Sequence, residues 1–353
     1  MENSFFIYTR KDNTIQIERF HICSWEFNNN SSLVEFGFEI SKESIKNDNL
    51  TISLFIPWAE KSCETKDLYD KLSIAENSRF IFNDSISATK YLKPNTNNSG
   101  VIHTFSGRNE LCVLPADIKI GEDKIVTATL NLKAYREYNQ ESKPNIYFRF
   151  WIKPSVPFIS MRKKGVSKSI IIYDIKVNER RNIPDNKIEY FNDQEFCKIK
   201  YCFSFNILPN KYDIVFFDNA SLKNVRTLEY ESFNKYLGDK RVKKDELIVV
   251  FNKKQDSESF SFFSIYSMER IGPGQFALAI LINIVCGVLL FIPAYRKSFE
   301  PELPFSQVWS NLPIEIFLAL GVAITTLFYF IWPTIQNTFN KVISWFKNEK
   351  GKK

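Results

Sequence analysis

Two long apolar stretches near the end of the chain constrain its fold more than any other feature. The first covers residues 274–295 without a formal charge, and the second covers residues 314–332 with one carboxylate, Glu315. A helix rises about 1.5 Å per residue, so each stretch is about as long as a hydrocarbon core of roughly 30 Å is thick. Helices of soluble proteins are seldom apolar on every face for this length. We therefore predict a transmembrane hairpin of two helices, 274–295 and 314–332, joined by a short extracytoplasmic loop at 296–313.

Basic residues predict how this hairpin is oriented. Residues 334–353 hold five lysines and one acid, Glu349, and Lys and Arg concentrate on the cytoplasmic side of membrane proteins. Residues 1–20 have no long apolar core before a cleavage site, so they do not resemble a secretory signal. We expect a two-pass protein of the inner membrane with both termini in the cytoplasm, although Arg296 and Lys297 in the connecting loop oppose this orientation.

The chain after the second apolar stretch has the pattern of an interfacial helix. Ile335, Phe339, Val342 and Phe346 recur at helical spacing among the lysines of the tail. A basic amphipathic helix of this kind lies in the headgroup layer of a membrane. We predict such a helix over 335–348, with a solvated charged tail as the alternative.

The region before the apolar stretches is typical of an antiparallel β-sandwich. Apolar and polar residues alternate over 34–40, 126–133 and 146–153, which gives each segment one apolar and one polar face. The chain contains 33 Phe, and aromatic residues favour strands. We predict a β-sandwich domain over 1–180. Further strands are expected at 14–27, 50–58, 79–82, 101–105 and 169–177, with a short helix within 65–75.

A second, smaller unit of β or α+β type is predicted over 181–270. Residues 198–207 alternate like a strand, and residues 246–251 and 260–266 are also strand-like. Between them, the apolar residues of 220–237 recur at roughly helical spacing. A strand–helix–strand order of this kind indicates a small separate unit or a helical insertion in a second sheet.

Two basic runs lie in predicted loops of this β-rich region. They comprise Arg162, Lys163 and Lys164, and Lys240, Arg241, Lys243 and Lys244. Such runs are either solvated or contact lipid headgroups or an acidic partner. The net charge of the chain is +7, of which the last twenty residues contribute +4. The rest is nearly balanced, which argues against a nucleic-acid-binding surface.

The sequence predicts no catalytic residue, metal site or cofactor. It contains no Gly-rich phosphate loop and no hydrolase or zinc motif, and its six cysteines form no C-x-x-C pair. His21 and His103 lie in predicted strands, where a hydrogen-bonded histidine is commoner than a catalytic base. The polar segment 106–110 is either a binding loop or a turn between strands. We therefore predict that the protein is not an enzyme.

Three polar residues lie within the predicted membrane helices. Asn283 is near the middle of the first, and Thr325 and Thr326 are in the second. Polar residues at this depth contact other helices or line a water path. Two helices cannot enclose a pore, so conduction would require several copies of the chain.

Three classes of function agree with these features. The first is a non-enzymatic membrane-anchored protein whose cytoplasmic β-rich domain recognises a partner or ligand. The second is an oligomerising effector that forms a pore or depolarises the membrane, with the β-rich region as sensor. Sensors fused to a short hairpin occur in bacterial antiviral defence, a parallel of architecture only. The third is a membrane-bound enzyme with an unrecognised site. The expected partners are the lipid bilayer and a protein partner or a second copy.

Overall fold

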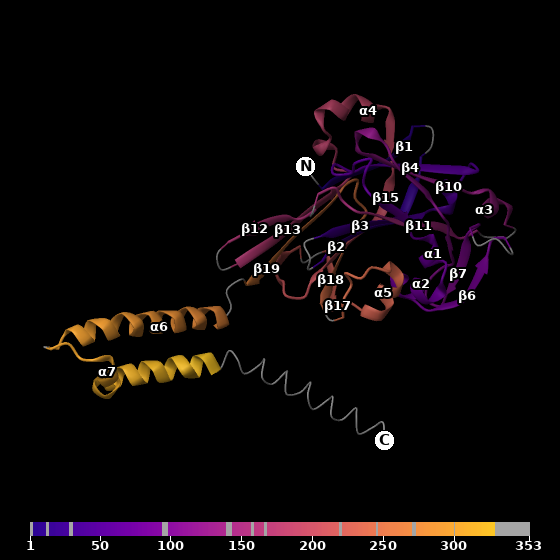
Figure 1. Cartoon of the computed structure of the whole chain (residues 1–353). Helices are drawn as coiled ribbons and strands as arrows, with labels where there is room; N and C mark the ends of the chain where they lie inside the picture. The colour runs from indigo at the N-terminus through magenta and orange to yellow at the C-terminus, as the bar shows by residue number, and fades with distance from the viewer. Residues whose placement is uncertain are drawn as a thin grey trace, which may run out of the picture. The chain divides into compact units, whose positions relative to one another are not determined.

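In the computed structural model, the chain is mainly β-structure and carries helices toward its C-terminal end (Figure 1). Chain contacts divide it into two compact units, one of residues 1–164 and 170–268 and one containing the C-terminal helices. The structure describes residues 3–11, 14–27, 31–93, 98–138, 143–156, 159–165, 168–218, 221–244, 246–269, 273–299 and 301–328.

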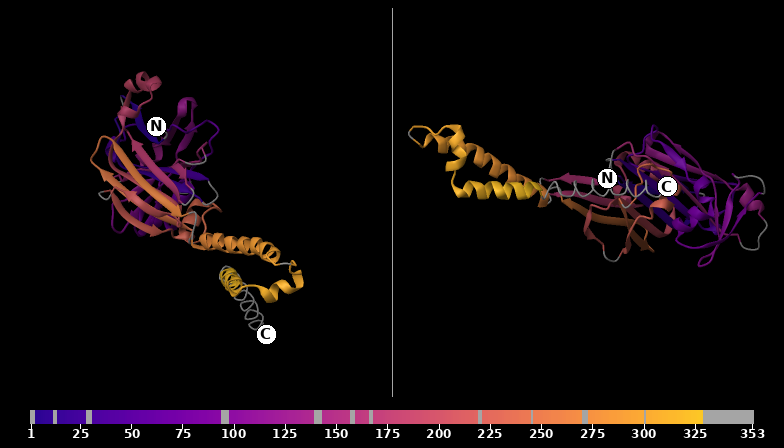
Figure 2. Two further views of the ribbon diagram at one scale, coloured as in Figure 1. Left: turned by 90° about the vertical axis from the view of Figure 1, so that its left-hand side faces the viewer. Right: turned by 60° about the horizontal axis from the view of Figure 1, so that its bottom comes forward.

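The first of two sheets has nine strands. Its order is β16 (Asp213–Phe217), β19 (Phe260–Glu269), β13 (Lys168–Val177), β1 (Ser4–Arg10), β4 (Asn49–Phe55), β10 (Ile125–Asn131) and β9 (Asp117–Ile120). Two further strands attach beside this path: β12 (Met161–Lys164) pairs with β13, and β14 (Gln194–Phe196) pairs with β1. Figure 2 shows the orange β19 beside β13 from two further directions.

The second sheet has ten strands. Its order is β17 (Leu222–Thr227), β18 (Leu247–Gln255), β15 (Lys198–Pro209), β2 (Gln16–Glu26), β3 (Ser32–Ile40), β11 (Asn145–Ile152), β8 (Leu111–Val113), β7 (Val101–Phe105) and β6 (Ile86–Tyr91), with β5 (Thr65–Asp67) beside β11. Strands from 181–269 thus enter both sheets, so no break in hydrogen bonding separates the expected second unit from the first.

The prediction of a mainly β fold is confirmed, but the sheets are mixed rather than wholly antiparallel. The pairs β1–β13, β2–β15 and β8–β11 are parallel. Parallel neighbours cannot be joined by a tight hairpin and need a long connection. The partners β2 and β15 are separated by most of the β-rich region, which is why local alternation could not reveal their direction.

The two sheets share an apolar core on their facing sides. Phe5 of β1 meets Phe36 of β3 edge-on, with ring centroids 5.6 Å apart. Phe38 of β3 stacks on Phe148 of β11 at 4.7 Å. These rings belong to one cluster of buried side chains that draws on both sheets. Burial of this apolar surface holds the two sheets together.

Three helices cover part of the other face of the ten-stranded sheet. They are α1 (Tyr69–Leu72), α2 (Ala75–Phe82) and α5 (Tyr230–Leu237). A second buried cluster joins Leu72 of α1 and Tyr236 of α5 to Leu33, Tyr147 and Ile207 of the sheet. Two further short helices, α3 (Lys133–Glu137) and α4 (Ile188–Asn192), lie elsewhere in this unit.

Near this helical layer, the strand predicted over 79–82 was wrong, and the helix predicted over 220–237 forms only at α5. Residues 79–82 end helix α2 instead of forming a strand, because Asn77 and Ser78 bond to carbonyl groups of Lys71 and Leu72 and hold the helix against α1. Residues 222–227 form strand β17 instead of starting a helix at 220. The register of β17 against β18 shifts at a bulge, and this extra residue disguises the alternation of a strand.

The C-terminal unit contains α6 (Pro273–Lys297), α7 (Phe305–Asn311) and the apolar helix Ile314–Phe328. Within the described ranges, α6 is the one helix long and apolar enough to cross a bilayer, over Ala277–Lys297. The helix Ile314–Phe328 is shorter, and residues 329–332 lie outside the described residues, so the two-helix transmembrane hairpin is not confirmed. The tail helix predicted over 335–348 also lies outside them.

Candidate functional site

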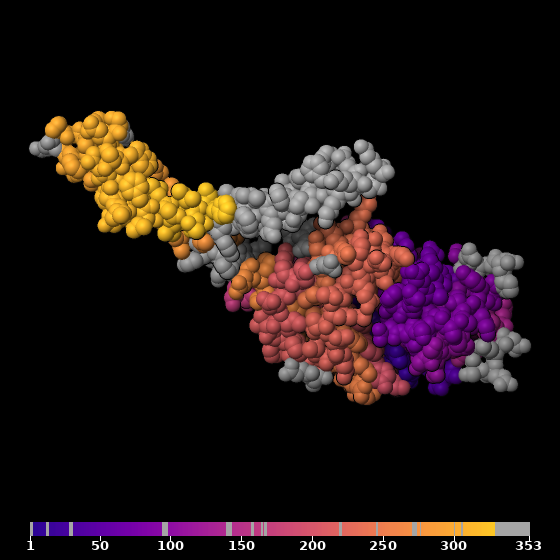
Figure 3. All heavy atoms as spheres, turned by 90° about the horizontal axis from the view of Figure 1, so that it is seen from below, coloured from indigo at the N-terminus to yellow at the C-terminus, as the bar shows by residue number. Residues whose placement is uncertain are grey.

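A cavity of about 350 Å³ lies on the helix-covered face of the ten-stranded sheet. Residues of α2 form one side of it, and residues of β2, β15, β17 and β18 form the other. Figure 3 views this face, where the salmon residues around α5 and β17 adjoin the purple residues around α2. Pockets for small molecules have volumes of about 300 to 1,000 Å³, so the cavity has room for a small ligand.

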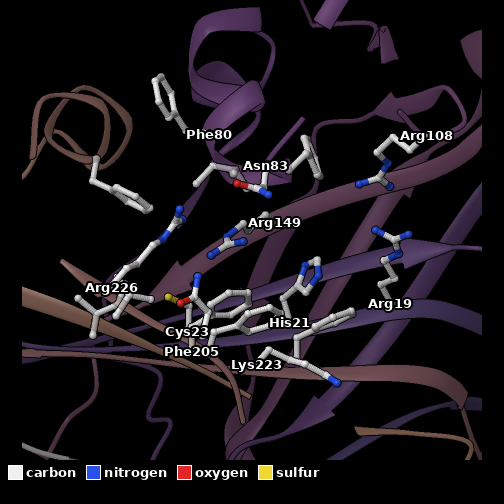
Figure 4. Close-up of a pocket in the computed structure, with 18 residues that line it drawn as sticks. Arg19, His21, Cys23, Phe80, Asn83, Arg108, Arg149, Phe205, Lys223 and Arg226 are labelled. Carbon is white, nitrogen blue, oxygen red and sulfur yellow. The ribbon is translucent and has the colours of Figure 1, made fainter. Parts of the chain in front are cut away.

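Positive side chains surround this cavity. Five of them line it: Arg19, Arg108, Arg149, Lys223 and Arg226. Among the described residues that line it, none is a carboxylate. In the close-up, Arg19 and Arg108 lie together on one side, Arg226 lies on the other, and Arg149 lies between them (Figure 4).

Arg149 is held at the bottom of the cavity by a buried hydrogen-bond network around Glu35. Its Nε atom donates to Glu35 Oε2 at 2.6 Å, and the hydroxyl of Tyr236 on α5 donates to the same oxygen at 3.0 Å. Trp25 Nε1 donates to Glu35 Oε1 at 2.8 Å. Burial alone would lower the pKa of Arg149, but the Glu35 carboxylate raises it well above its usual value. The guanidinium is therefore a permanent charge.

Glu39 neutralises only one of the two arginines on its side of the cavity. Its Oε2 atom lies 2.9 Å from Arg108 Nη2 and 3.5 Å from Arg19 Nε, while Oε1 accepts a bond from Asn145 at 3.0 Å. One carboxylate shared by two guanidinium groups leaves an excess positive charge.

The cations of β17 are the most weakly neutralised. Arg226 pairs with Glu229 at 3.3 Å near the surface, where such a pair contributes little. Lys223 forms no ion pair with any residue that the structure describes. Five cations against three paired carboxylates leave the site with a net charge of +2.

The pKa of His21 is affected both by burial and by this positive environment. Burial lowers the pKa of His21 well below its ordinary value, and the charges of Arg149, Arg19 and Arg108 lower it further. Its Nδ1 atom lies 3.1 Å from the Tyr147 hydroxyl. His21 is thus a neutral, hydrogen-bonded strand histidine near pH 7, in line with the interpretation from its sequence context.

Aromatic rings form much of the remaining surface of the cavity. Phe205 of β15 and Phe251 of β18 stack with ring centroids 4.6 Å apart, and His21 lies 4.9 Å from Phe203. Phe80 of α2 also lines the cavity, and in the close-up it lies on the helix side, apart from the labelled strand residues (Figure 4). The site therefore combines flat apolar surfaces with guanidinium groups.

The first predicted basic run does not form part of this cavity. Arg162 lies in strand β12 rather than in a loop, and it pairs with the buried carboxylate of Glu26 at 2.6 Å. Lys163 is exposed, and the side chain of Lys164 lies outside the described residues. A headgroup contact by this run stays a prediction.

The second predicted run lies in the turn between α5 and β18. Arg241 is bound by Asp239 at 2.6 Å, and Lys243 lies 3.9 Å from Glu246. Lys240 and Lys244 are exposed. None of these four residues lines the cavity in the described part of the chain, and their contact with an acidic partner stays a prediction.

The three polar residues of the predicted membrane helices differ in their hydrogen bonding. The hydroxyls of Thr325 and Thr326 donate to the carbonyls of Gly321 and Val322, four residues earlier, at 2.9 and 2.8 Å. Asn283 is exposed on α6, and no hydrogen bond joins its side chain to another described residue. Of these three residues, Asn283 alone therefore has a side-chain polar group without a hydrogen-bond partner in the described part of the chain.

Sequence reasoning missed most of the residues that line the cavity. The segment 106–110 was one candidate binding loop, and its Arg108 does reach the cavity. Arg149 falls on the polar face of the predicted strand 146–153, and Arg19 lies within the predicted strand 14–27. Arg226 lies in a segment that was predicted to be helical. A usable signal was present in β11, where Arg149 stands between Tyr147 and Trp151 on a face too aromatic for a solvated surface.

These features define a β-rich protein with a positively charged, aromatic-lined cavity and a helix of membrane-spanning length. Comparison with protein-family models and with curated proteins found no match to this chain.

Proposed function

We propose that this protein is a membrane-anchored recognition protein whose β-rich region binds a small anionic ligand in the cavity. One observation carries the proposal: five cations line a cavity of small-molecule size, and the carboxylates that pair with them lie outside its surface. Guanidinium groups are suited to phosphate and carboxylate groups because their donors form a planar fork. The absence of an enzymatic role stays a prediction.

We propose that α6, together with the apolar segment that ends near residue 332, anchors the protein in the membrane. Leu289 and Leu290 of α6 are 63% and 77% exposed, and lipid would cover such residues. The basic tail favours cytoplasmic termini at the inner membrane of a bacterium. Green fluorescent protein fused to the C-terminus of the full chain should then fluoresce, and alkaline phosphatase at the same place should be inactive. The reverse result would refute this orientation.

Anion binding can be tested on the full-length protein in detergent. We expect inorganic tripolyphosphate and citrate to raise the melting temperature by a few degrees, since a ligand that binds only the folded state stabilises it. Arg226→Ala should reduce this gain, whereas Lys253→Ala, on neighbouring β18 but outside the cavity, should not. Equal stabilisation by the cation spermidine, or an unchanged response of Arg226→Ala to the anions, would count against the proposal.

Asn283 favours the oligomerising effector as a second candidate function. An amide group in the middle of a membrane helix is costly unless another helix supplies a hydrogen-bond partner. We expect cross-linking in membranes to yield oligomers of the full chain and Asn283→Leu to reduce them. If the oligomers also depolarise cells, loss of depolarisation in Asn283→Leu would favour the effector. Unchanged oligomers in this variant would leave the anchor as the function of α6.

A further inference from the structure

We propose that the ligand of this cavity is a nucleotide, with its base against the aromatic rings and its phosphates at the cations of β17. This inference rests on the proposed function, because it specifies the chemistry of the anion. A simple phosphate or carboxylate compound would need only the cations. The cavity also presents aromatic rings on both sides, namely Phe80 from α2 and Phe205 and Phe251 from the sheet.

A nucleobase matches this arrangement of rings. Proteins bind single bases by stacking them on aromatic side chains or on guanidinium planes. Two amide side chains, Asn83 and Asn224, also line the cavity and can bond to the edge of a base. Asn83 ends helix α2 in the left-handed conformation, with φ 52°, and in the close-up its side chain points toward Arg149 (Figure 4).

The cations differ in how readily they can bind phosphate. Arg149 and Arg108 are committed to Glu35 and Glu39, and their side chains are only 6% and 15% exposed. Arg226 is 37% exposed and has one surface partner, and Lys223 has no ion pair among the described residues. Both residues of β17 can therefore turn toward an incoming phosphate without leaving a buried carboxylate unpaired. Arg149 and Arg108 supply a fixed positive field.

Titration calorimetry of the full-length protein in detergent tests the inference. The probes are ATP, GTP, CTP and UTP, each compared with inorganic tripolyphosphate, which carries the phosphates without a base. At least one nucleotide should bind ten or more times as tightly as tripolyphosphate. If tripolyphosphate binds as tightly as all four nucleotides, the nucleotide is excluded and the anion site stands. If none of the five binds, the nucleotide is excluded, and the anion site fails as well unless citrate stabilises the protein.

Variants separate the contribution of the base from that of the phosphates. Phe251→Leu should weaken nucleotide binding about tenfold and leave tripolyphosphate binding unchanged, since stacking of one base contributes roughly a factor of ten or more. Phe80→Leu on α2 provides the same test if the sheet variant does not fold. Arg226→Ala should weaken nucleotide and tripolyphosphate by a similar factor, while Lys253→Ala should weaken neither. Equal losses for both probes in Phe251→Leu and Phe80→Leu would overturn the assignment of the base.

Discussion

The two faces of the ten-stranded sheet are both buried, but by different means. On β11, Ile146 and Phe148 point into the apolar core between the sheets, and their neighbours Tyr147 and Arg149 point beneath the helices. The first face is stabilised by the burial of apolar surface, which does not depend on the direction of individual contacts. The second face depends on the charge of Arg149, which is paired with the carboxylate of Glu35. The proposed ligand site lies on the second face.

The largest expected effect of a single change is on this charged face. Arg149→Met should lower the free energy of unfolding by about 3 to 5 kcal/mol, because Glu35 is left buried without its cation. The double variant Glu35→Gln with Arg149→Met should recover part of this loss. Denaturant unfolding of the full chain in detergent, followed by tryptophan fluorescence, measures both. Arg10→Met, at an exposed position of β1, is the control. A double variant no more stable than Arg149→Met would contradict the pairing.

The helix α5 is attached to the same carboxylate by one hydrogen bond. Tyr236→Phe should lower the free energy of unfolding by about 1.5 to 3 kcal/mol, because a hydrogen bond to a charged group is lost while the ring and its packing remain. The same unfolding measurement applies. Tyr230→Phe on α5 is the matched control, because no hydrogen bond of its hydroxyl is found within the described chain. Equal effects of the two variants would mean that Glu35 does not hold the helix.

The apolar face should tolerate a change of shape better. Phe148→Leu keeps the position apolar but leaves a small cavity, so we expect it to lower the free energy of unfolding by about 1 to 2 kcal/mol, less than Arg149→Met does. We expect nucleotide and tripolyphosphate affinities to be unchanged, because Phe148 points away from the cavity. If Phe148→Leu lowered the free energy of unfolding more than Arg149→Met does, the apolar face would be the more sensitive of the two faces.

The apolar face was predictable from sequence, and the charged face was not. Alternation over 34–40 and 146–153 predicted β3 and β11 and the inward direction of Phe36 and Phe148. The same alternation gave no sign that Glu35 and Arg149 would be covered. The covering helices come from residues 69–82 and 230–237, and a strand's own pattern contains no information about such distant segments. Burial of the charges is therefore a tertiary effect, as are the parallel strand pairs.

The last expected effect concerns a partly buried acid without a described cation beside it. Asp67 of β5 lies beside β11, forms no ion pair with a described residue, and has its pKa raised by burial to about 7. Folding therefore favours its protonated form. Its stabilising contribution is complete below the unfolded pKa of about 4 and is lost as the pH rises through 7. Asp67→Asn stays uncharged, so it should raise the melting temperature by a few degrees at pH 8 and by less at pH 5.

The control for this last variant is Asp117→Asn, at an exposed position that pairs with Lys119. Its melting temperature should follow that of the natural protein at both pH values, because its charge is solvated in the folded and unfolded states. A stabilisation by Asp67→Asn that is equal at pH 5 and pH 8 would mean that the side chain does not titrate in this range. The effect of Asp67→Asn would then come from a change in packing and not from the removal of a charge. A gain confined to high pH would show that the charged form of Asp67, which has no described cation beside it, destabilises the fold.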